Sequence, residues 1–137
     1  NHPCAVWTRA SRGNFDAATA LCQALAAEYR YRFDKFHASE AALAWVIRHR
    51  GAAQVPDGPM TPYALAMPEK YNKAWRNVGC LPATETVRPG LYGCVLAYRA
   101  YYRAEKRGHW RANPHSKRQT WVPAKWTRRN PPEWFIL

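Results

Sequence analysis

The chain is poor in glycine and has no glycine-rich loop. Its seven glycines never form a Gly-x-Gly pattern, on which the loops that cradle the phosphates of nucleotide cofactors depend. Ser11 and Ser39 lack the neighbouring glycines of a nucleophile elbow, so a hydrolase triad has no support either. We therefore expect no cofactor.

Metal ligands at the usual spacing are also missing. The cysteines contain no Cys-x-x-Cys pair, and no two histidines stand at metal-ligand spacing, which argues against zinc or another metal. An even number of cysteines leaves disulfides open, but no secretory signal opens the chain, and buried free thiols are the simpler expectation. The residues concerned are Cys4, Cys22, Cys80 and Cys94, and His2, His37, His49, His109 and His115.

Long apolar runs are absent as well. No stretch approaches the roughly twenty apolar residues that cross a bilayer, whereas 47% apolar and 14% aromatic residues are typical of a globular chain. We expect a single soluble, cytoplasmic domain, 1–137, without a membrane partner. The His2-Pro3 step directly after Asn1 reads like the middle of a protein, which suggests a missing or cleaved upstream segment.

Acidic residues are scarce, and the positive charge gathers in one part of the chain. Positions 88–137 hold eleven bases and two acids (11 − 2 = +9), and 1–87 hold ten and seven (10 − 7 = +3). Lys and Arg neutralise phosphates, and indole faces can stack on bases, so we predict a polyanion partner. The alternative is a solvated basic tail whose indoles attach it to the core. Those indoles are Trp110, Trp121, Trp126 and Trp134.

Helical spacing dominates the first hundred residues. Apolar residues recur three and four apart along several segments that are bounded by capping residues, proline or glycine. The predicted helices are 14–33, a second between the cap Ser39 and the stop Gly51, a short one at 69–78, and a fourth from Pro89 to the stop Gly108. The side chains expected to face the core are Phe15, Ala18, Cys22, Leu25, Tyr29 and Phe33, then Leu43, Val46 and Ile47, then Leu91, Val95, Tyr98 and Tyr102.

Prolines interrupt this pattern twice. Four prolines and the Asp57-Gly58 step predict a long ordered or semi-ordered loop at 51–68. Beyond the fourth helix, prolines forbid long helices and no period-2 strand pattern appears, so we expect the tail to wrap the body in extended form. The predicted fold class is mainly α: a compact single-domain helical body, 1–107, with the Pro-rich loop 51–68 and an extended basic, Trp-rich C-terminal tail, 108–137.

The densest polar cluster of the first helix contains Glu28 and Arg32. The two residues stand at i and i+4, hence on one helix face. Glu28 is the candidate catalytic acid or base, or the anchor that orients Arg32 towards phosphate. The alternative, which we favour for an isolated pair, is an ordinary ion pair on the helix surface.

Rings and cations alternate on the fourth helix and in the tail. An exposed Tyr101 could stack or wedge between bases while the flanking arginines contact phosphates, and Trp126 could stack on a base or belong to the core, with core slightly favoured. We predict double-stranded DNA, bound with weak sequence preference, as the partner; the oligomeric state is left open. The predicted nucleic-acid-binding residues are Arg32, Arg99, Tyr101, Arg103, Lys106, Arg107, Lys125, Trp126, Arg128 and Arg129.

Several segments together resemble a family of small phage-encoded proteins, and the resemblance covers nearly the whole chain. The segments are Asn1-His2-Pro3 with Trp7, Ser11 and Asn14; Glu28-Tyr29-x-Tyr31-Arg32 with Lys35 and His37; Pro56-x-Gly58-Pro59 leading to Ala66-Met67-Pro68; Ala97-Tyr98-Arg99-x-Tyr101-Tyr102; and Lys125-Trp126-Thr127-x-Arg129 with Pro132 and Trp134.

More distantly, the His-Pro opening and the segment 28–35 are similar to pyrimidine dimer DNA glycosylases of the phage endonuclease V type. That resemblance implies a compact helical repair enzyme of the infected cell's cytoplasm that removes a damaged base with an amine nucleophile and a carboxylate and without a metal. The resemblance also implies that the amine and the carboxylate belong to a segment upstream of the His-Pro step. Members of the phage-encoded family likewise carry an upstream segment, which is rich in Cys, Asp, Lys and His. The expected function is DNA binding of glycosylase type in phage DNA repair or base modification. The alternatives are a non-catalytic nucleic-acid-binding module and a structural or interaction protein with an acidic partner.

Overall fold

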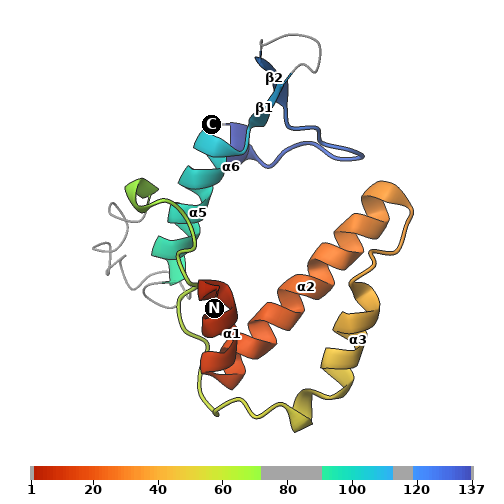
Figure 1. Ribbon diagram of the computed structural model, residues 1–137, viewed down its shortest axis with the longest axis vertical. Coiled ribbons are helices and arrows are strands. Elements are labelled where there is room, and N and C mark those ends of the chain that lie inside the picture. The colour runs from red at the N-terminus through yellow and green to blue at the C-terminus, as the bar shows by residue number, and fades with distance from the viewer. Residues whose placement is uncertain (1, 72–90, 113–118, 137) are drawn as a thin grey trace. The chain divides into compact units, whose positions relative to one another are not determined.

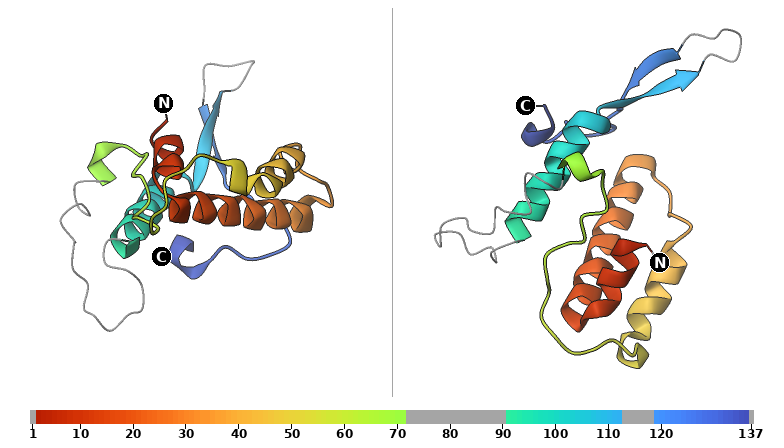
Figure 2. Two further views of the ribbon diagram at one scale, coloured as in Figure 1. Left: turned by 90° about the horizontal axis from the view of Figure 1, so that it is seen from below. Right: turned by 60° about the vertical axis from the view of Figure 1, so that its left-hand side comes forward.

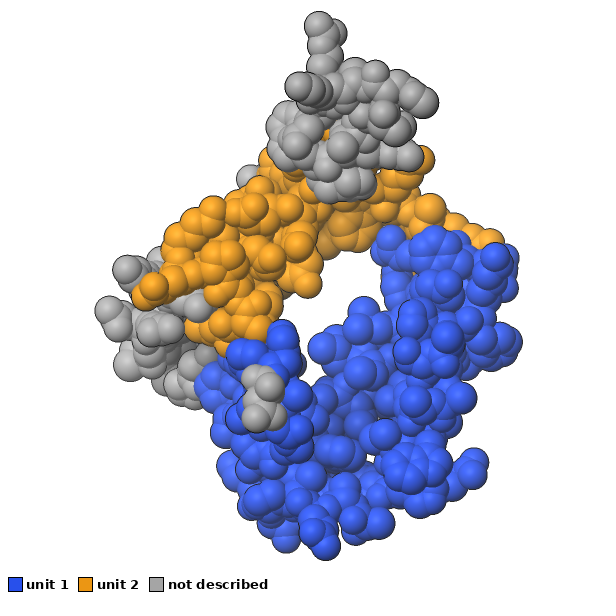
Figure 3. All heavy atoms as spheres, in the orientation of Figure 1, with its two compact units in different colours: residues 1–64 blue, residues 65–137 orange. Residues whose placement is uncertain are grey.

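The computed structural model describes residues 2–71, 91–112 and 119–136. The chain is mainly helical, as the sequence predicts, and divides into two compact units, Asn1–Ala64 (unit 1) and Leu65–Leu137 (unit 2) (Figure 3). The predicted body, 1–107, and tail, 108–137, have other bounds than these units, because the fourth predicted helix belongs to unit 2. That the two units form one domain stays a prediction. No helix in the described ranges is long and apolar enough to cross a membrane.

Unit 1 begins with two helices that meet at Ser11. The side chain of His2 caps the first helix by accepting a hydrogen bond from the Cys4 N–H at 3.2 Å, and Pro3 fills the first helical position. Ser11 caps the second helix by accepting from the Asn14 N–H at 3.2 Å. The sequence analysis missed the first helix and began the second at 14, because it took Asn14 as the start signal. The elements of unit 1 are α1 (Pro3–Ala10), α2 (Arg12–Phe33), α3 (Glu40–Arg48) and the 3-10 helix η1 (Arg50–Ala52) (Figure 1).

A buried asparagine joins the α1–α2 junction to the Pro-rich loop. Asn14 is 0% exposed; its Oδ1 accepts from the Thr61 N–H at 2.7 Å, and its Nδ2 donates to the Trp7 carbonyl at 2.9 Å and to Thr61 Oγ1 at 3.0 Å. A Cβ on Gly13 would lie 2.2 Å from the backbone nitrogen of Met60, so only glycine allows the loop this close. The loop carries no helix or strand from 53 to 68, as predicted, yet these contacts fix it on α2.

The same loop satisfies the open N-terminus of α2. The first N–H groups of a helix have no partner within the helix, and here the Arg12 N–H donates to the Pro56 carbonyl at 2.8 Å and the Gly13 N–H to the Gly58 carbonyl at 3.0 Å. The Arg12 guanidinium also donates to the Ala53 carbonyl at 2.9 Å. Unit 1 is therefore held together largely by polar contacts to loop carbonyls.

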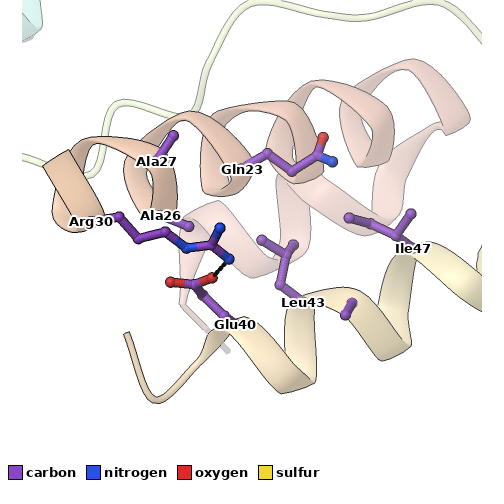
Figure 4. Close-up of a pocket in the computed structure, with 8 residues that line it drawn as sticks. Gln23, Ala26, Ala27, Arg30, Glu40, Leu43 and Ile47 are labelled. Carbon is purple, nitrogen blue, oxygen red and sulfur yellow. Dashed lines mark hydrogen bonds and ion pairs between the residues drawn. The ribbon is translucent and has the colours of Figure 1, made fainter. Parts of the chain in front are cut away.

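α2 and α3 pack side by side along an open groove of about 220 Å³ (Figure 4). The groove is lined by Gln23, Ala26, Ala27, Arg30, Glu40, Leu43, Ala44 and Ile47. The predicted inward face of α2 was therefore partly wrong: Leu25 is 59% exposed, Phe33 is 49% exposed, and Cys22 is exposed. The face of α2 that packs against α3 contains the small residues Ala26 and Ala27, which allow α3 to approach closely. This face, and not the one with Leu25, is turned towards α3. Ile47 is 37% exposed despite its predicted inward position.

Unit 2 combines a helix with a β-hairpin. Its described elements are α5 (Leu91–Glu105), β1 (Gly108–Ala112), β2 (Gln119–Pro123) and α6 (Glu133–Ile136) (Figure 2). The strands are antiparallel, with Gly108 opposite Pro123 and Ala112 opposite Gln119. The sequence showed no strand pattern and predicted an extended tail; within that tail, 108–112 and 119–123 are extended as the two strands of a hairpin. The close approach of the strands requires glycine at 108, because a Cβ there would lie 2.3 Å from the Val122 carbonyl oxygen.

The core of unit 2 lies where α6 packs on α5. Cys94 and Ala97 of α5 are 5% and 0% exposed, and Phe135 of α6 is 9% exposed. Of the expected helix at 69–78, residues 69–71 are helical, and the remainder lies outside the described residues. Cys94 is buried, as expected, whereas Cys4 is half-buried and Cys22 exposed. Cys4 and Cys22 are free thiols, and Cys80 lies outside the described residues.

Candidate nucleic-acid interface

The two compact units differ sharply in charge. Residues 65–137 contain fourteen Lys and Arg and four Asp and Glu (14 − 4 = +10), and residues 1–64 contain seven and five (7 − 5 = +2). A surface that attracts a polyanion is therefore to be sought in unit 2.

An aromatic row lies along α5. The Tyr101 ring packs between Tyr71, at a centroid distance of 5.3 Å, and Tyr102, at 5.7 Å, and Lys106 Nζ lies 5.4 Å from its centroid. The sequence analysis expected Tyr101 to be exposed and Tyr98 and Tyr102 to be buried. The structure corrects this: Tyr101 and Tyr98 are half-buried and Tyr102 is 43% exposed. The reason is Tyr71, which covers Tyr101 from outside the helix.

The acid at the end of α5 is neutralised. Lys70 Nζ donates to Glu105 Oε1 at 2.7 Å, and the Tyr71 hydroxyl donates to the same oxygen at 2.8 Å. These hydrogen bonds, that of Lys70 above all, lower the pKa of Glu105, and the same contact raises the pKa of Lys70. Glu105 therefore stays ionised and paired at neutral pH, which weakens its repulsion of an anionic ligand.

Arg107 is hydrogen-bonded to both ends of the segment 124–136, which follows the hairpin. Its backbone carbonyl accepts a hydrogen bond from the Ala124 N–H at 2.7 Å, and its Nη2 donates to the Ile136 carbonyl at 3.1 Å. The segment 124–132, which we call the basic loop, runs out from the hairpin and returns through α6 to α5 (Figure 1). The guanidinium of Arg107, predicted as a phosphate contact, thus serves first to close this loop.

Aromatic packing supports the basic loop from inside. The Trp126 ring meets the buried Phe135 edge to face at 5.1 Å, and Trp134 meets Phe135 at 5.8 Å. The guanidinium of Arg99 lies 5.4 Å from the Trp134 ring centroid, a cation–π contact between α5 and α6. Trp126 is half-buried, as is Arg99, so both residues contribute to packing within unit 2.

Six predicted cations remain exposed around this frame: Arg103, Lys106, Arg107, Lys125, Arg128 and Arg129. Within the described part of the chain, the side chains of Arg103 and Lys125 make no hydrogen bond or ion pair. Because Ala124 is bonded to Arg107, Lys125 begins the basic loop beside the end of α5 that carries Arg103 and Lys106. The hairpin thus brings two basic segments, separate in sequence, to one place.

Arg128 turns the basic loop. Its φ is 64°, in the left-handed region that costs a residue with a Cβ roughly 1–2 kcal/mol. The bend at 128–129 reverses the chain towards α6.

Glu28 and Arg32 lie apart from these groups in the sequence, on α2 of unit 1. Arg32 Nε donates to Glu28 Oε1 at 2.6 Å, and both side chains are partly buried. This is the i,i+4 ion pair that the alternative interpretation favoured. The roles of Glu28 as a catalytic group and of Arg32 as a phosphate ligand stay predictions.

Sequence reasoning missed the residues that support the interface. Phe135 was not singled out, although it follows Trp134 and two prolines in the sequence. Tyr71 was noted only as part of the predicted helix 69–78 and not as a neighbour of Tyr101. Gly108 was seen only as a helix stop, whereas it also permits the strand pairing that positions Lys125.

Comparison with protein-family models, curated proteins and solved structures found no match for this chain. Among the described residues no cluster of three or more His, Cys, Asp or Glu could hold a metal ion.

Proposed function

We propose that this protein binds double-stranded DNA, with little sequence preference, through the exposed cations of α5 and the basic loop. The observation that carries the proposal is the closure of the loop on Arg107, which sets Lys125 beside the end of α5 that bears Arg103 and Lys106. Cations held on a fixed frame can meet successive phosphates, and such contacts provide most of the affinity of non-specific DNA binding.

The charge balance and the aromatic frame support the same ligand. The +10 of residues 65–137 (14 − 4) attracts a polyanion, and the pairing of Glu105 with Lys70 reduces the repulsion that a carboxylate would exert on phosphate. Half-buried Trp126 and Arg99 keep the loop in place without being free to stack on a base. The frame therefore favours phosphate contacts over reading of base edges.

The test is the salt dependence of binding to a random-sequence duplex, followed by fluorescence anisotropy. About six phosphate contacts give a slope of log affinity against log salt near −5. Replacement of Arg103 and Lys125 by alanine should reduce this slope by about 2, since each phosphate contact contributes about 1. The melting temperature should be unchanged, because exposed charges add little to stability.

A matched control removes two cations from unit 1. Arg9 and Lys35 are exposed and have no ion pair among the described residues, so their replacement by alanine changes the net charge equally. This control should keep the slope of the unaltered protein. Equal slopes for the two double variants would reduce the effect to net charge alone and contradict the proposed surface. Binding that does not depend on salt would contradict DNA as the ligand, and retention by an acidic protein alone would favour the interaction-protein alternative.

We extend the proposal to DNA repair or base modification of glycosylase type on the strength of the resemblance to phage glycosylases. Base removal with strand cleavage passes through a Schiff base between an enzyme amine and the sugar aldehyde, which borohydride traps. Glu28 is the nominated carboxylate, but it is occupied by Arg32 at 2.6 Å. Because Arg32 holds this carboxylate, we expect no trapped adduct of the protein with abasic DNA. Trapping that Glu28→Gln abolishes would instead identify Glu28 as a catalytic residue.

A further inference from the structure

An aromatic pair on α3 of unit 1 faces solvent. Trp45 is 61% exposed, and its ring stacks on that of His49 at a centroid distance of 4.3 Å and an interplanar angle of 27°. At about 100° per residue, Trp45 stands roughly 160° around the helix from Leu43 and Ile47, which line the groove with α2. The pair is thus not part of the packing between the two helices, which Figure 4 shows on the other face of α3.

The His49 ring is held in place by the backbone. Its Nδ1 lies 2.8 Å from the Trp45 carbonyl oxygen; since a carbonyl only accepts, Nδ1 carries the proton and donates. The ring therefore covers one face of the indole in a fixed orientation, and the other face remains accessible. We call this stacked pair, Trp45 and His49, the platform. Because it is ordered before binding, it loses little conformational entropy when a flat ligand stacks on it.

Positive charge borders the platform. Arg48 is exposed and forms no ion pair within the described chain. The acid of its own helix, Glu40, is paired with Arg30, and Asp16 is paired with the neighbouring Arg50. An aromatic surface beside an available guanidinium matches a nucleotide, which offers a flat base and a phosphate a short distance apart.

We propose that Trp45 and His49 form a second binding site, which stacks an unpaired base of single-stranded DNA while Arg48 contacts its phosphate. The inference rests on the proposed function only in taking DNA as the ligand. It assigns to unit 1 a separate task, the capture of an unpaired base, which the cations of unit 2 cannot perform.

The experiment compares a single-stranded oligothymidylate with a duplex as ligands of the full chain. Trp45→Ala should weaken binding of the single strand by roughly 5- to 150-fold, the range that corresponds to the stacking of one base. Affinity for the duplex, the salt slope and the melting temperature should stay unchanged, since stacking releases no counterions and the indole is largely outside the core. Trp45→Phe, which keeps a flat ring, should restore most of the affinity.

Leu25→Ala provides the control. Leu25 is 59% exposed on α2 and close to Trp45 in exposed fraction, but it has no ring, so the variant should bind the single strand as the unaltered protein does. Equal losses for Leu25→Ala and Trp45→Ala would overturn the inference, as would unchanged single-strand binding by Trp45→Ala. A lowered melting temperature with Trp45→Ala would do the same, because it would assign the indole to the packing of unit 1.

The two proposals fail in different ways. If the duplex binds with the expected salt slope and Trp45→Ala has no effect, only the stacking site is wrong. If the single strand binds through Trp45 and the duplex does not bind, the stacking site is supported and the function proposed for unit 2 is wrong. Absence of binding to either ligand overturns both.

Discussion

Asn14 and Thr61, which stand 47 residues apart, exchange hydrogen bonds: the Thr61 N–H donates to Asn14 Oδ1 at 2.7 Å, and Asn14 Nδ2 donates to Thr61 Oγ1 at 3.0 Å. Trp7 joins them, since its indole Nε1 donates to the same hydroxyl at 3.0 Å. The rings of Trp7 and Tyr63 lie 5.2 Å apart over this contact. Unit 1 thus has a polar centre where a helical domain usually has an apolar one.

Asn14→Ala should destabilise unit 1 strongly. It leaves the Thr61 N–H and the Trp7 carbonyl without their partner; each is partly buried, so each should cost up to about 1–3 kcal/mol, the range for a buried group. Urea unfolding followed by circular dichroism measures the loss. Gln23→Ala, an exposed amide on the same helix, should change the free energy of unfolding little. Similar losses for both variants would show that Asn14 is not the centre of the unit.

Gly13→Ala should destabilise the protein, whereas Gly51→Ala should not. A Cβ at Gly13 meets the backbone of Met60 at 2.2 Å and cannot be relieved by a side-chain rotation; at Gly51 nothing lies within 4 Å. We expect a loss of about 1–3 kcal/mol for the first variant, as for overpacking elsewhere. Thermal unfolding of the two variants provides the comparison, and equal melting temperatures would contradict the close contact between α2 and the loop.

Stability should fall in acid. A hydrogen bond from Arg50 lowers the pKa of Asp16 below its ordinary 3.8, and one from Arg30 lowers the pKa of Glu40 below 4.5. Such a carboxyl binds fewer protons when folded than when unfolded, so its stabilisation is complete above the ordinary pKa and is lost as pH falls through the lowered one. Urea unfolding should show a decline below about pH 4.5, shallow because both pairs are exposed.

A double variant tests which carboxyl groups cause the loss of stability in acid. Asp16→Asn combined with Glu40→Gln removes the two titrating groups of unit 1 and should make the decline on the acid side shallower, leaving the part that Glu105 of unit 2 contributes. An unaltered pH dependence would mean that other carboxyls cause it.

Arg128 allows charge to be separated from backbone strain. Both Arg128→Gly and Arg128→Ala remove the cation, but only glycine accepts a φ of 64° without cost. The glycine variant should therefore be more stable than the alanine variant by about 1 kcal/mol, and the two should lose the same affinity for duplex DNA. Melting temperature and anisotropy check the two halves of this prediction. If the affinities differ, the backbone turn rather than the charge governs binding.

The sequence predicted the helices better than the faces they bury. α5 follows from the spacing of Val95, Tyr98 and Tyr102, and in the described part of the expected range it runs from Leu91 to Glu105. The expected start at Pro89 lies outside the described residues. Local spacing cannot reveal which neighbour covers a helix, so Tyr101, covered by Tyr71, and Leu25, left uncovered by α3, were assigned to the wrong side. Whether a side chain is buried depends on which other segment packs against it, and the periodicity of one segment carries no information about that partner.

The site was predictable in composition but not in arrangement. Lys125, Arg128 and Arg129 were recognised from the density of charge alone. The position of these three cations depends on the hairpin. Neither strand of the hairpin alternates polar and apolar residues clearly enough to be predicted from the sequence. The pairing is a non-local contact that Gly108 permits sterically and that no local pattern encodes.

The double attachment of the basic loop at Arg107 constrains how this protein can vary. The main chain of that residue accepts from the backbone N–H of position 124, and its side chain donates to the backbone carbonyl of position 136. Because both partner atoms belong to the backbone, the side chains at 124 and 136 do not take part in these two contacts, and only proline at 124 would remove one of them. In lineages that share this fold, we therefore expect the arginine at 107 to be retained, while the cations carried on the loop remain exchangeable.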